Sequence, residues 1–236
     1  MRKQKEVRNP SFNSGNKLKL TIDDLLVVNS MTENQSDFLS SYRDHTVHIL
    51  RGSAGVGKTF LAIYRALEDV LDKGTPYNKL IITRAPVEVG KGIGALPGDL
   101  SEKGSVYELP YYGICDGLFN KNGAYGRLKE QGVIEFMLTS FTRGLTFDNT
   151  ICVVDEYQSL TYHELYSIMT RIGDKSKILF CGDTKQSDLR STVGVTKFDT
   201  IISRMTDTHV TTFTSDDIVR SDIVREFIIN DEKWSD

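Results

Sequence analysis

Hydrophobic residues along the chain form short runs, separated by longer segments in which apolar positions recur at helical spacing. The runs predict strands at residues 47–50, 80–84, 133–138, 150–155 and 177–183. The helical spacing predicts helices at 60–67 and 161–171, the second ended by Gly173, then a helix near 196–205, a strand near 208–213 and a helix near 218–229. Buried strands that alternate with helices predict an α/β fold with a mainly parallel sheet covered by helices on both faces.

The 236 residues fit one large domain that follows a short tail. Residues 1–20 carry six basic residues against one acidic residue, and we expect a basic flexible tail there. That tail is either a solvated leader or an arm that contacts nucleic-acid phosphates. Residues 21–236 are expected to form a single domain, which begins with a short helical approach at 21–44 capped by Thr21.

Residues 85–130 interrupt the alternation and are expected to form a long insertion. They hold nine of the 19 glycines and three of the five prolines, and loops of this length are usually functional or mobile. The tyrosines of the insertion either stack on bases or pack the insertion against the core. They are Tyr107, Tyr111, Tyr112 and Tyr125, and the basic residues among them are Lys91, Lys103, Lys121, Arg127 and Lys129.

Composition narrows the class of protein. The net charge of −3 means that any nucleic-acid contact must use a local basic patch. Three cysteines without CxxC spacing argue against a disulfide framework or a zinc cluster, and Cys152 and Cys181 are expected to be buried. The four histidines are scattered along the chain, which argues against a metal site built from them. No apolar run approaches the ~18 residues of a membrane span.

The strongest chemical signal is a match to G-x-x-x-x-G-K-[ST], the phosphate-binding P-loop, between the strand at 47–50 and the following helix. Its glycines allow a tight turn that points backbone N–H groups at one phosphate, and the new helix favours an anion at its start. Lys58 supplies a charge for the β- and γ-phosphates, and the Thr59 hydroxyl is a Mg²⁺ ligand. The loop residues are Gly52, Ser53, Ala54, Gly55, Val56, Gly57, Lys58 and Thr59.

Two later strand ends carry the polar residues that a P-loop site needs. Asp155 is predicted to hold Mg²⁺, and Glu156 to orient or deprotonate the attacking water. Gln186 follows the strand at 177–183, where it either contacts the γ-phosphate or the water, or lies in a solvated surface turn. Residues 155–158 and 182–186 resemble the DExQ and GDxxQ motifs of superfamily 1 helicases.

With these motifs in place, the chain resembles the PhoH-like P-loop ATPase family, which has many phage-encoded members. The resemblance runs from about Gln35 to Arg225. It implies a RecA-like P-loop NTPase fold with ATP and Mg²⁺ as cofactors. Besides the motifs above, it rests on residues 83–90, 96–100, 143–147, 170–173 and 217–220.

The resemblance also implies roles for four residues. Gln35 would recognise adenine, and Arg220 would reach a γ-phosphate. Arg84 and Arg143 would lie near the phosphates or the nucleic-acid face, or else form surface ion pairs. If Arg220 acts on the ATP of a neighbouring copy, the chain must form a ring or another head-to-tail homo-oligomer.

The expected function is Mg²⁺-dependent ATP hydrolysis coupled to the binding or remodelling of single-stranded RNA or DNA, with helicase or translocase activity as one form of it. The alternative is an ATP-dependent switch or assembly module that acts on a protein partner, and a small-molecule kinase is less favoured. No membrane association is expected. The expected location is cytoplasmic, which is the host cytoplasm for a phage-encoded protein.

Overall fold

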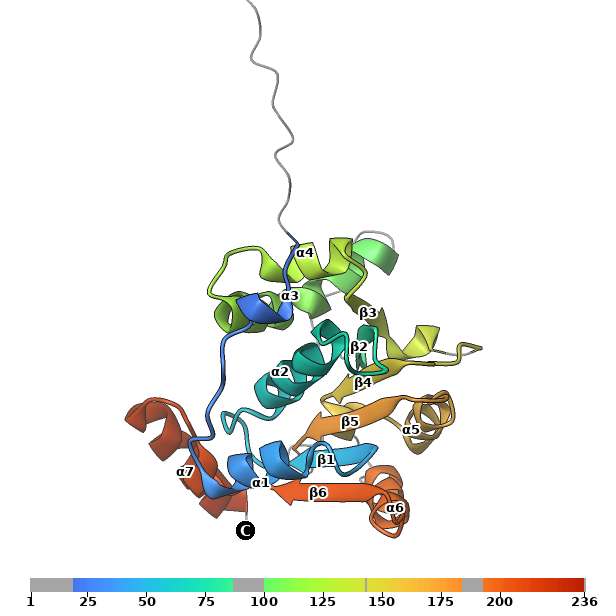
Figure 1. The fold of residues 1–236 in the computed structure, drawn as a ribbon. Coiled ribbons are helices and arrows are strands. Elements are labelled where there is room, and N and C mark those ends of the chain that lie inside the picture. The colour runs from blue at the N-terminus through green and yellow to red at the C-terminus, as the bar shows by residue number, and fades with distance from the viewer. Residues whose placement is uncertain (1–18, 87–99, 143, 184–192, 236) are drawn as a thin grey trace, which may run out of the picture.

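Six parallel strands form one sheet in the order β3-β2-β4-β5-β1-β6 (Figure 1). The computed structural model describes residues 19–86, 100–142, 144–183 and 193–235. The predicted parallel sheet is confirmed, with each strand within about two residues of its expected position. The strands are β1 (Val47–Arg51), β2 (Lys79–Arg84), β3 (Ile134–Leu138), β4 (Thr150–Asp155), β5 (Lys177–Gly182) and β6 (Thr208–Thr212).

Helices cover both faces of this sheet, as the alternation of elements predicts. The first face is covered by α1 (Glu33–Ser41), α2 (Lys58–Leu71), α3 (Leu100–Phe119) and α4 (Ala124–Glu130), with α7 (Asp222–Ser235) at its margin. The second face is covered by α5 (Tyr162–Met169) and α6 (Val193–Ile202). Four short 3-10 segments complete the described elements: η1 (Ile22–Asp24), η2 (Thr139–Phe141), η3 (Tyr157–Ser159) and η4 (Ser215–Asp217).

The central strand β4 shows why the apolar runs lack helical spacing. Successive side chains of a strand point to opposite faces. Ile151 and Val153 enter the core under α2, whereas Cys152 and Val154 enter the core under α5 and α6. A strand buried on both faces therefore needs apolar residues at every position.

Strand register brings the predicted catalytic motifs to one edge of the sheet. Asp155 pairs with Arg84 on one side and with Cys181 on the other. Cys181 in turn pairs with Leu50, two residues before the P-loop. Because the strands are parallel, their carboxyl ends meet at this edge, where α/β sheets bind ligands.

The expectation of a long loop at 85–130 is wrong over its second part, which forms α3 and α4. The helices form despite Pro110 and several glycines because they bury large side chains, among them Leu118, Phe119 and Leu128, in the core. Tertiary burial overrides weak local propensity here. Residues 87–99 lie outside the described residues.

The tyrosines of this segment mostly follow the packing alternative. Tyr111 and Tyr125 are fully buried, and each donates a hydrogen bond to a carboxylate. Tyr112 is 40% exposed, and its ring contacts that of Tyr125. Two of the basic residues among these tyrosines form ion pairs, since Lys121 pairs with Asp24 and Lys129 with Glu108.

Some predicted boundaries move for identifiable reasons. Helix α5 ends at Met169, and Gly173 instead lies beside Phe147, whose carbonyl oxygen accepts its N–H. The last helix begins at Asp222, after a turn in which Thr214 caps η4. Leu20, assigned to the tail, is buried, and its backbone exchanges two hydrogen bonds with the Gln131 side chain. Residues 1–18 lie outside the described residues.

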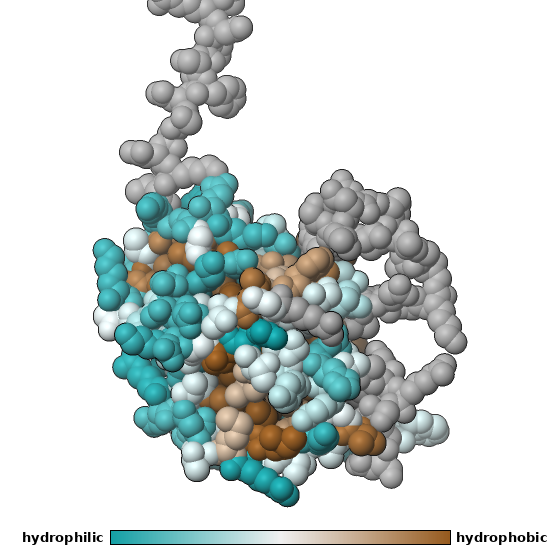
Figure 2. Space-filling model, turned by 90° about the vertical axis from the view of Figure 1, so that its right-hand side faces the viewer, coloured by the Kyte–Doolittle hydropathy of each residue, from teal (hydrophilic) through white to brown (hydrophobic). Residues whose placement is uncertain are grey.

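The described surface is mixed in polarity. Figure 2 shows hydrophilic residues along the left margin of this view and several patches of hydrophobic residues beside them, the lowest at the height of α6 in Figure 1. Val193 and Ile201 are exposed hydrophobic side chains of α6. All three cysteines are buried, and burial raises the pKa of Cys115 and of Cys152 to about 12. In the described residues, every helix is too short or too polar to cross a bilayer.

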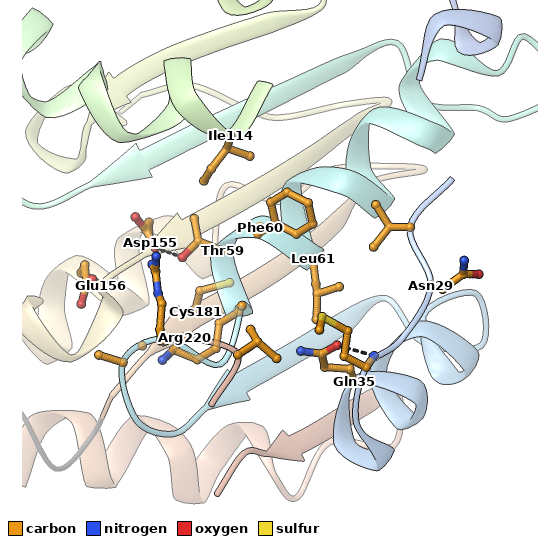
Figure 3. A pocket seen from close by; sticks show the side chains of 18 residues that line it. Asn29, Gln35, Thr59, Phe60, Leu61, Ile114, Asp155, Glu156, Cys181 and Arg220 are labelled. Carbon is orange, nitrogen blue, oxygen red and sulfur yellow. Dashed lines mark hydrogen bonds between the residues drawn. The ribbon is translucent and has the colours of Figure 1, made fainter. Parts of the chain in front are cut away.

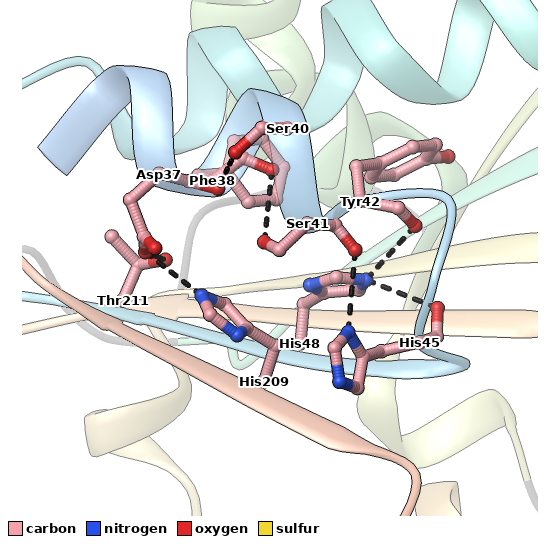
Figure 4. A network of polar contacts seen from close by, with 9 residues as sticks. All are labelled: Asp37, Phe38, Ser40, Ser41, Tyr42, His45, His48, His209 and Thr211. Atoms are coloured by element: carbon pink, nitrogen blue, oxygen red, sulfur yellow. Dashed lines mark hydrogen bonds and ion pairs between the residues drawn. The ribbon is translucent and has the colours of Figure 1, made fainter. Parts of the chain in front are cut away.

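At the amino edge of the sheet, three histidines that are scattered in sequence come together (Figure 4). The ring centroids of His45 and His209 lie 5.3 Å apart, and those of His45 and His48 lie 6.0 Å apart. His209 pairs with Asp37, whose carboxylate also accepts the Thr211 hydroxyl. Among the described residues no group of three or more His, Cys, Asp or Glu side chains is arranged to hold a metal ion. The cluster joins α1 to β1 and β6.

A buried lysine and the buried His48 fix the turn between α1 and β1. The His48 Nε2 lies 3.2 Å from the carbonyl oxygen of Tyr42 and 3.1 Å from that of His45. Lys177 donates to the same two oxygens. Nε2 must therefore carry the proton of a neutral His48, and Nδ1 has no hydrogen-bond partner in the described part of the chain. Burial, and then the charge of Lys177, lowers the pKa of His48 to about 4.

We expect His48 to make the protein acid-sensitive. Its pKa falls from 6.5 in the unfolded chain to about 4 in the folded one. As pH falls, the unfolded state therefore takes up a proton before the folded state does. The contribution of His48 to stability is fully present above pH 6.5 and is lost as pH falls from 6.5 toward 4. This group alone accounts for about 3 kcal/mol of unfolding free energy. Urea unfolding at several pH values measures it.

The matched variants are His48→Gln, which keeps an amide donor without titrating, and His163→Gln, at an exposed histidine of α5. Between pH 6.5 and 4, the wild type should lose more stability than His48→Gln and as much as His163→Gln. Parallel curves for the wild type and His48→Gln would contradict the assignment.

Candidate functional site

The loop of residues 52–57 connects β1 to α2 and is shaped by glycines with positive φ. Gly52 has φ of 144°, Gly55 of 82° and Gly57 of 90°. Gly57 is the N-cap of α2, and no side chain in the described residues caps that helix. The N–H groups of its first turn are thus left for a ligand, and the helix dipole favours a phosphate there.

Lys58, the first residue of α2, is folded back on this loop. Its Nζ donates to the carbonyl oxygens of Gly52 at 2.6 Å and Ser53 at 2.7 Å. Burial lowers the pKa of Lys58, and the charge of Asp183 opposes that shift. A phosphate that replaced the two carbonyl oxygens would keep the ammonium paired.

Thr59 and Asp155 bring the P-loop helix and β4 into direct contact. The Thr59 hydroxyl donates to Asp155 Oδ1 at 2.6 Å (Figure 3). The other oxygen, Oδ2, accepts a hydrogen bond from the Tyr111 hydroxyl at 2.9 Å, and the Arg84 Nη1 lies 4.0 Å from the same oxygen. Burial raises the pKa of Asp155, while the hydrogen bond from Thr59 lowers it.

Glu156 follows in a left-handed backbone conformation, with φ of 53°. Its carboxylate accepts a hydrogen bond from the Gln158 Nε2 at 2.6 Å. The Gln158 Oε1 accepts one from the backbone N–H of Asp183 at 3.1 Å. Gln158 therefore connects the ends of β4 and β5 and holds Glu156. Gln158 is the last residue of the DExQ-like motif, and the motif alone predicted no role for it.

A cavity of about 530 Å³ runs from these carboxylates to the N-terminal segment. In Figure 3, Thr59, Asp155 and Glu156 lie toward the left of the cavity, and Asn29 and Gln35 lie toward the right. Apolar side chains line the part between them, as suits the flat faces of a base and sugar. They are Phe60, Leu61 and Ile114, and Val28 also lines the cavity. No sequence motif marks three further lining residues of the N-terminal segment, which are Val28, Asn29 and Met31.

Gln35 lines the cavity but is 3% exposed, with its amide engaged by the protein. Its Nε2 donates to the carbonyl oxygen of Val56 at 3.1 Å, and its Oε1 accepts the N–H of Met31 at 2.8 Å. The side chain thus ties the P-loop to the N-terminal segment. Adenine recognition by Gln35 stays a prediction, and it requires the amide to exchange one of these partners.

Arg220 lines the same cavity of its own chain. Its backbone neighbour Val219 donates to the carbonyl oxygen of Gly55 at 3.1 Å. A Cβ at Gly55 would lie 2.8 Å from the Arg220 Cγ, so the side chain lies directly over the loop. Gln186 and Arg143 fall outside the described residues.

Helix α7 also reaches the loop. The Ser53 hydroxyl donates to the Glu232 carboxylate. This contact joins residues 179 positions apart, and no sequence pattern marks it. It means that the P-loop is in contact with the C-terminal helix.

Comparisons with known proteins agree with the motif pattern. Residues 27–230 match the family model described as PhoH-like protein. The PhoH-like protein of Mycobacterium leprae is 33% identical over 215 residues, which is 89% of this chain and 61% of that protein. The PhoH-like protein of Bacillus subtilis is 36% identical over 160 residues, 67% of this chain and 49% of that protein. The chain spans about half to three-fifths of the length of these curated relatives.

A similar solved structure is the large terminase of the thermophilic bacteriophage D6E in complex with ADP. The TM-score is 0.48 and the identity 15%. The match covers 83% of this chain and 48% of the terminase chain.

We expect Gly52→Ala to destabilise the loop. An added Cβ would overlap the carbonyl oxygen and Cβ of Phe213, which follows β6, and the positive φ strains any L side chain. The variant should lose about 1–3 kcal/mol of unfolding free energy. Urea unfolding gives the stability, and titration with a fluorescent nucleotide gives the binding, which should weaken.

Gly113→Ala is the control, because a Cβ there meets no described atom within 4 Å and an interior helix position favours alanine. It should be at least as stable as the wild type. Equal stability of Gly52→Ala and the wild type would show that the contact with Phe213 does not fix the loop.

Proposed function

Since the chain belongs to the PhoH-like protein family, we propose that it hydrolyses ATP with Mg²⁺ and couples hydrolysis to single-stranded RNA or DNA. The observation that carries the proposal is the 2.6 Å contact between the Thr59 hydroxyl and Asp155 Oδ1. It sets a P-loop hydroxyl beside a strand-end carboxylate, and Lys58 and Glu156 line the same cavity. Phosphoryl transfer needs this grouping of positive charge, metal ligands and a water-orienting residue.

The residues present fit Mg²⁺. A hydroxyl and a carboxylate oxygen are the hard ligands that Mg²⁺ takes, and it usually uses one or two carboxylates together with substrate phosphates. Thr59 and Asp155 would hold the ion. Once bound, Mg²⁺ withdraws charge from the phosphate oxygens.

Each side chain then has one task. The N–H groups of residues 52–59 would hold the β-phosphate, and Lys58 would turn from the carbonyl oxygens of Gly52 and Ser53 to the γ-phosphate. Glu156, held by Gln158, would orient the water and accept its proton. Gln186 would sense the γ-phosphate.

Arg220 is proposed to act within its own chain. What supports this is its place over Gly55, on the wall of the cavity that holds Lys58 and Thr59. A ring is required only if Arg220 acts across a subunit boundary, so homo-oligomer formation stays a prediction without that support. Turnover per chain should therefore be constant across protein concentrations.

The nucleic-acid part of the proposal draws support from an aromatic and basic cluster on α5 and α6. Tyr166 is 57% exposed, and its ring centroid lies 6.2 Å from that of Tyr162. The Lys197 Nζ lies 4.0 Å from the Tyr162 ring centroid. Only η3 and its flanking residues separate α5 from Glu156. Exposed rings beside cations suit stacked bases and their phosphates.

A switch that acts on a protein partner remains the second candidate. Helix α7, which contacts Ser53 through Glu232, exposes hydrophobic side chains at Ile223, Phe227 and Trp234. A protein seated there would lie close to the P-loop. Stimulation of turnover by single strands favours the first candidate. Phosphate transfer to an added metabolite would instead indicate a kinase.

Glu156→Gln should bind ATP as the wild type does but hydrolyse it about 10²–10⁴-fold more slowly, because the water loses its base. Lys58→Ala should weaken binding about 10- to 100-fold, because a charge-assisted contact is lost. Calorimetry with Mg²⁺ and a non-cleavable analogue gives the affinity, and phosphate release gives the rate. Glu135→Gln, which alters an exposed ion pair on β3, is the control. Wild-type turnover in Glu156→Gln would remove its assigned role.

Tyr166→Ala should weaken binding of single-stranded RNA or DNA by about 1–3 kcal/mol, whereas Tyr166→Phe keeps the ring and the affinity. Lys197→Gln should reduce the slope of log affinity against log salt by about one phosphate contact. Fluorescence anisotropy over a salt series measures both. Lys73→Gln, past the end of α2, is the charge control. If Tyr166→Ala binds single strands as tightly as Tyr166→Phe, the surface is misassigned.

A further inference from the structure

Asp155 is held from two sides, and the second side is not part of the P-loop. Thr59 donates to Oδ1 from α2, and Tyr111 donates to Oδ2 from α3. Helix α3 belongs to the segment that interrupts the alternation of strands and helices. One carboxylate thus connects the nucleotide loop to the insertion.

The Tyr111 hydroxyl is well suited to hold an orientation. The residue is fully buried, and its ring packs against that of Phe136 on β3, with the two ring centroids 5.8 Å apart. The ring therefore has little freedom to follow Asp155 if the carboxylate turns. A change in the hydrogen bond must move α3, or the bond must break.

Helix α3 has little intrinsic stability of its own around this contact. Pro110 precedes Tyr111 and cannot donate to the Val106 carbonyl oxygen, and Gly113 and Gly117 follow within two turns. Such a helix depends on tertiary contacts for its position. The contact with Asp155 is one of those contacts.

Helix α3 faces the nucleotide cavity with one residue and exposes hydrophobic side chains elsewhere on its surface. Ile114 lines the nucleotide cavity. Val106, Leu109 and Tyr112 are 49%, 64% and 40% exposed on the outside. A shift of α3 would alter the cavity wall and the outer surface together.

We propose that Tyr111 is a positioning residue that orients Asp155 for Mg²⁺ and couples the loading of the nucleotide site to the position of α3. The inference rests on the proposed function, because it takes the Thr59–Asp155 pair as the metal site. It adds a role for the insertion: the insertion senses the metal-binding carboxylate through one phenol. Tyr111 itself contacts neither phosphate nor water.

The test uses two tyrosines of the same segment. Tyr111→Phe removes the donor to Asp155 and keeps the ring. Tyr125→Phe is the matched control, because Tyr125 is equally buried and donates to the Glu108 carboxylate on α3 at 2.8 Å, away from the site. Both variants should unfold in urea cooperatively, which shows that they are folded.

The first readout is the Mg²⁺ dependence of nucleotide binding, measured with a fluorescent non-cleavable ATP analogue and independent of turnover. Tyr111→Phe should need about 10- to 100-fold more Mg²⁺ for half-saturation, as is usual when a group that orients a metal ligand is lost. Nucleotide affinity without Mg²⁺ should equal that of the wild type. Tyr125→Phe should match the wild type in both.

The second readout is hydrogen exchange of the backbone amides at 106–119. In the wild type, and in Tyr125→Phe, the Mg²⁺-bound analogue should change exchange in this helix. In Tyr111→Phe the change should be absent. A wild type without that change would overturn the coupling even if Tyr111→Phe could not be produced.

The outcomes separate the two proposals. If the wild type binds the Mg²⁺-analogue complex and Tyr111→Phe has unchanged Mg²⁺ dependence and exchange, the role of Tyr111 is refuted and the ATPase proposal stands. Equal losses in Tyr111→Phe and Tyr125→Phe would also refute it, because they indicate general loosening. If the wild type binds no nucleotide, both proposals fail.

Discussion

The hydrogen bond between Thr59 and Asp155 is the contact on which the carboxyl edge of the sheet depends. Asp155 is 4% exposed, and a buried carboxylate is destabilising unless donors or cations surround it. Its partners come from three elements, Thr59 on α2, Tyr111 on α3 and Arg84 on β2. The position of each element is thereby linked to the others through one charge. A substitution at any of them should alter the contact between Thr59 and Asp155, the proposed Mg²⁺ ligands.

At each edge of the sheet a lysine donates to two backbone carbonyl oxygens, and the surroundings of the two lysines differ. At the amino edge, Lys177 and His48 share the fixed carbonyl oxygens of Tyr42 and His45. At the carboxyl edge, Lys58 donates to the loop carbonyl oxygens of Gly52 and Ser53, and Lys58 itself lines the cavity. Lys177 shares its two carbonyl oxygens with His48, whereas Lys58 begins a helix whose free N–H groups favour an anion, so a phosphate there could replace the carbonyl partners of Lys58. Exchangeable partners are what a binding site requires.

Patterns that are local in sequence could be predicted, and contacts between distant residues could not. The runs that became β1 and β4 follow from burial on both faces, and the glycines of the P-loop follow from its backbone angles. The helices at 100–130 were missed because Pro110 and the glycines signal a loop, while the burial that overrides them is visible only in three dimensions. The partners of Gln35 were equally hidden, since Met31 and Val56 reveal nothing in sequence of a shared amide.

The weak composition of α3 is itself informative. A helix of strong formers would hold its place whatever happened at Asp155, because its own propensity would exceed the ~1 kcal/mol of a single hydrogen bond. Pro110, Gly113 and Gly117 reduce that intrinsic stability. The free energy of one hydrogen bond then becomes comparable with the free-energy difference between two placements of the helix. Local rules and the global fold disagree in this segment, and such disagreement concentrates where a protein has to move. The composition that hid the helix from sequence analysis is therefore the property that suits it to respond to the site.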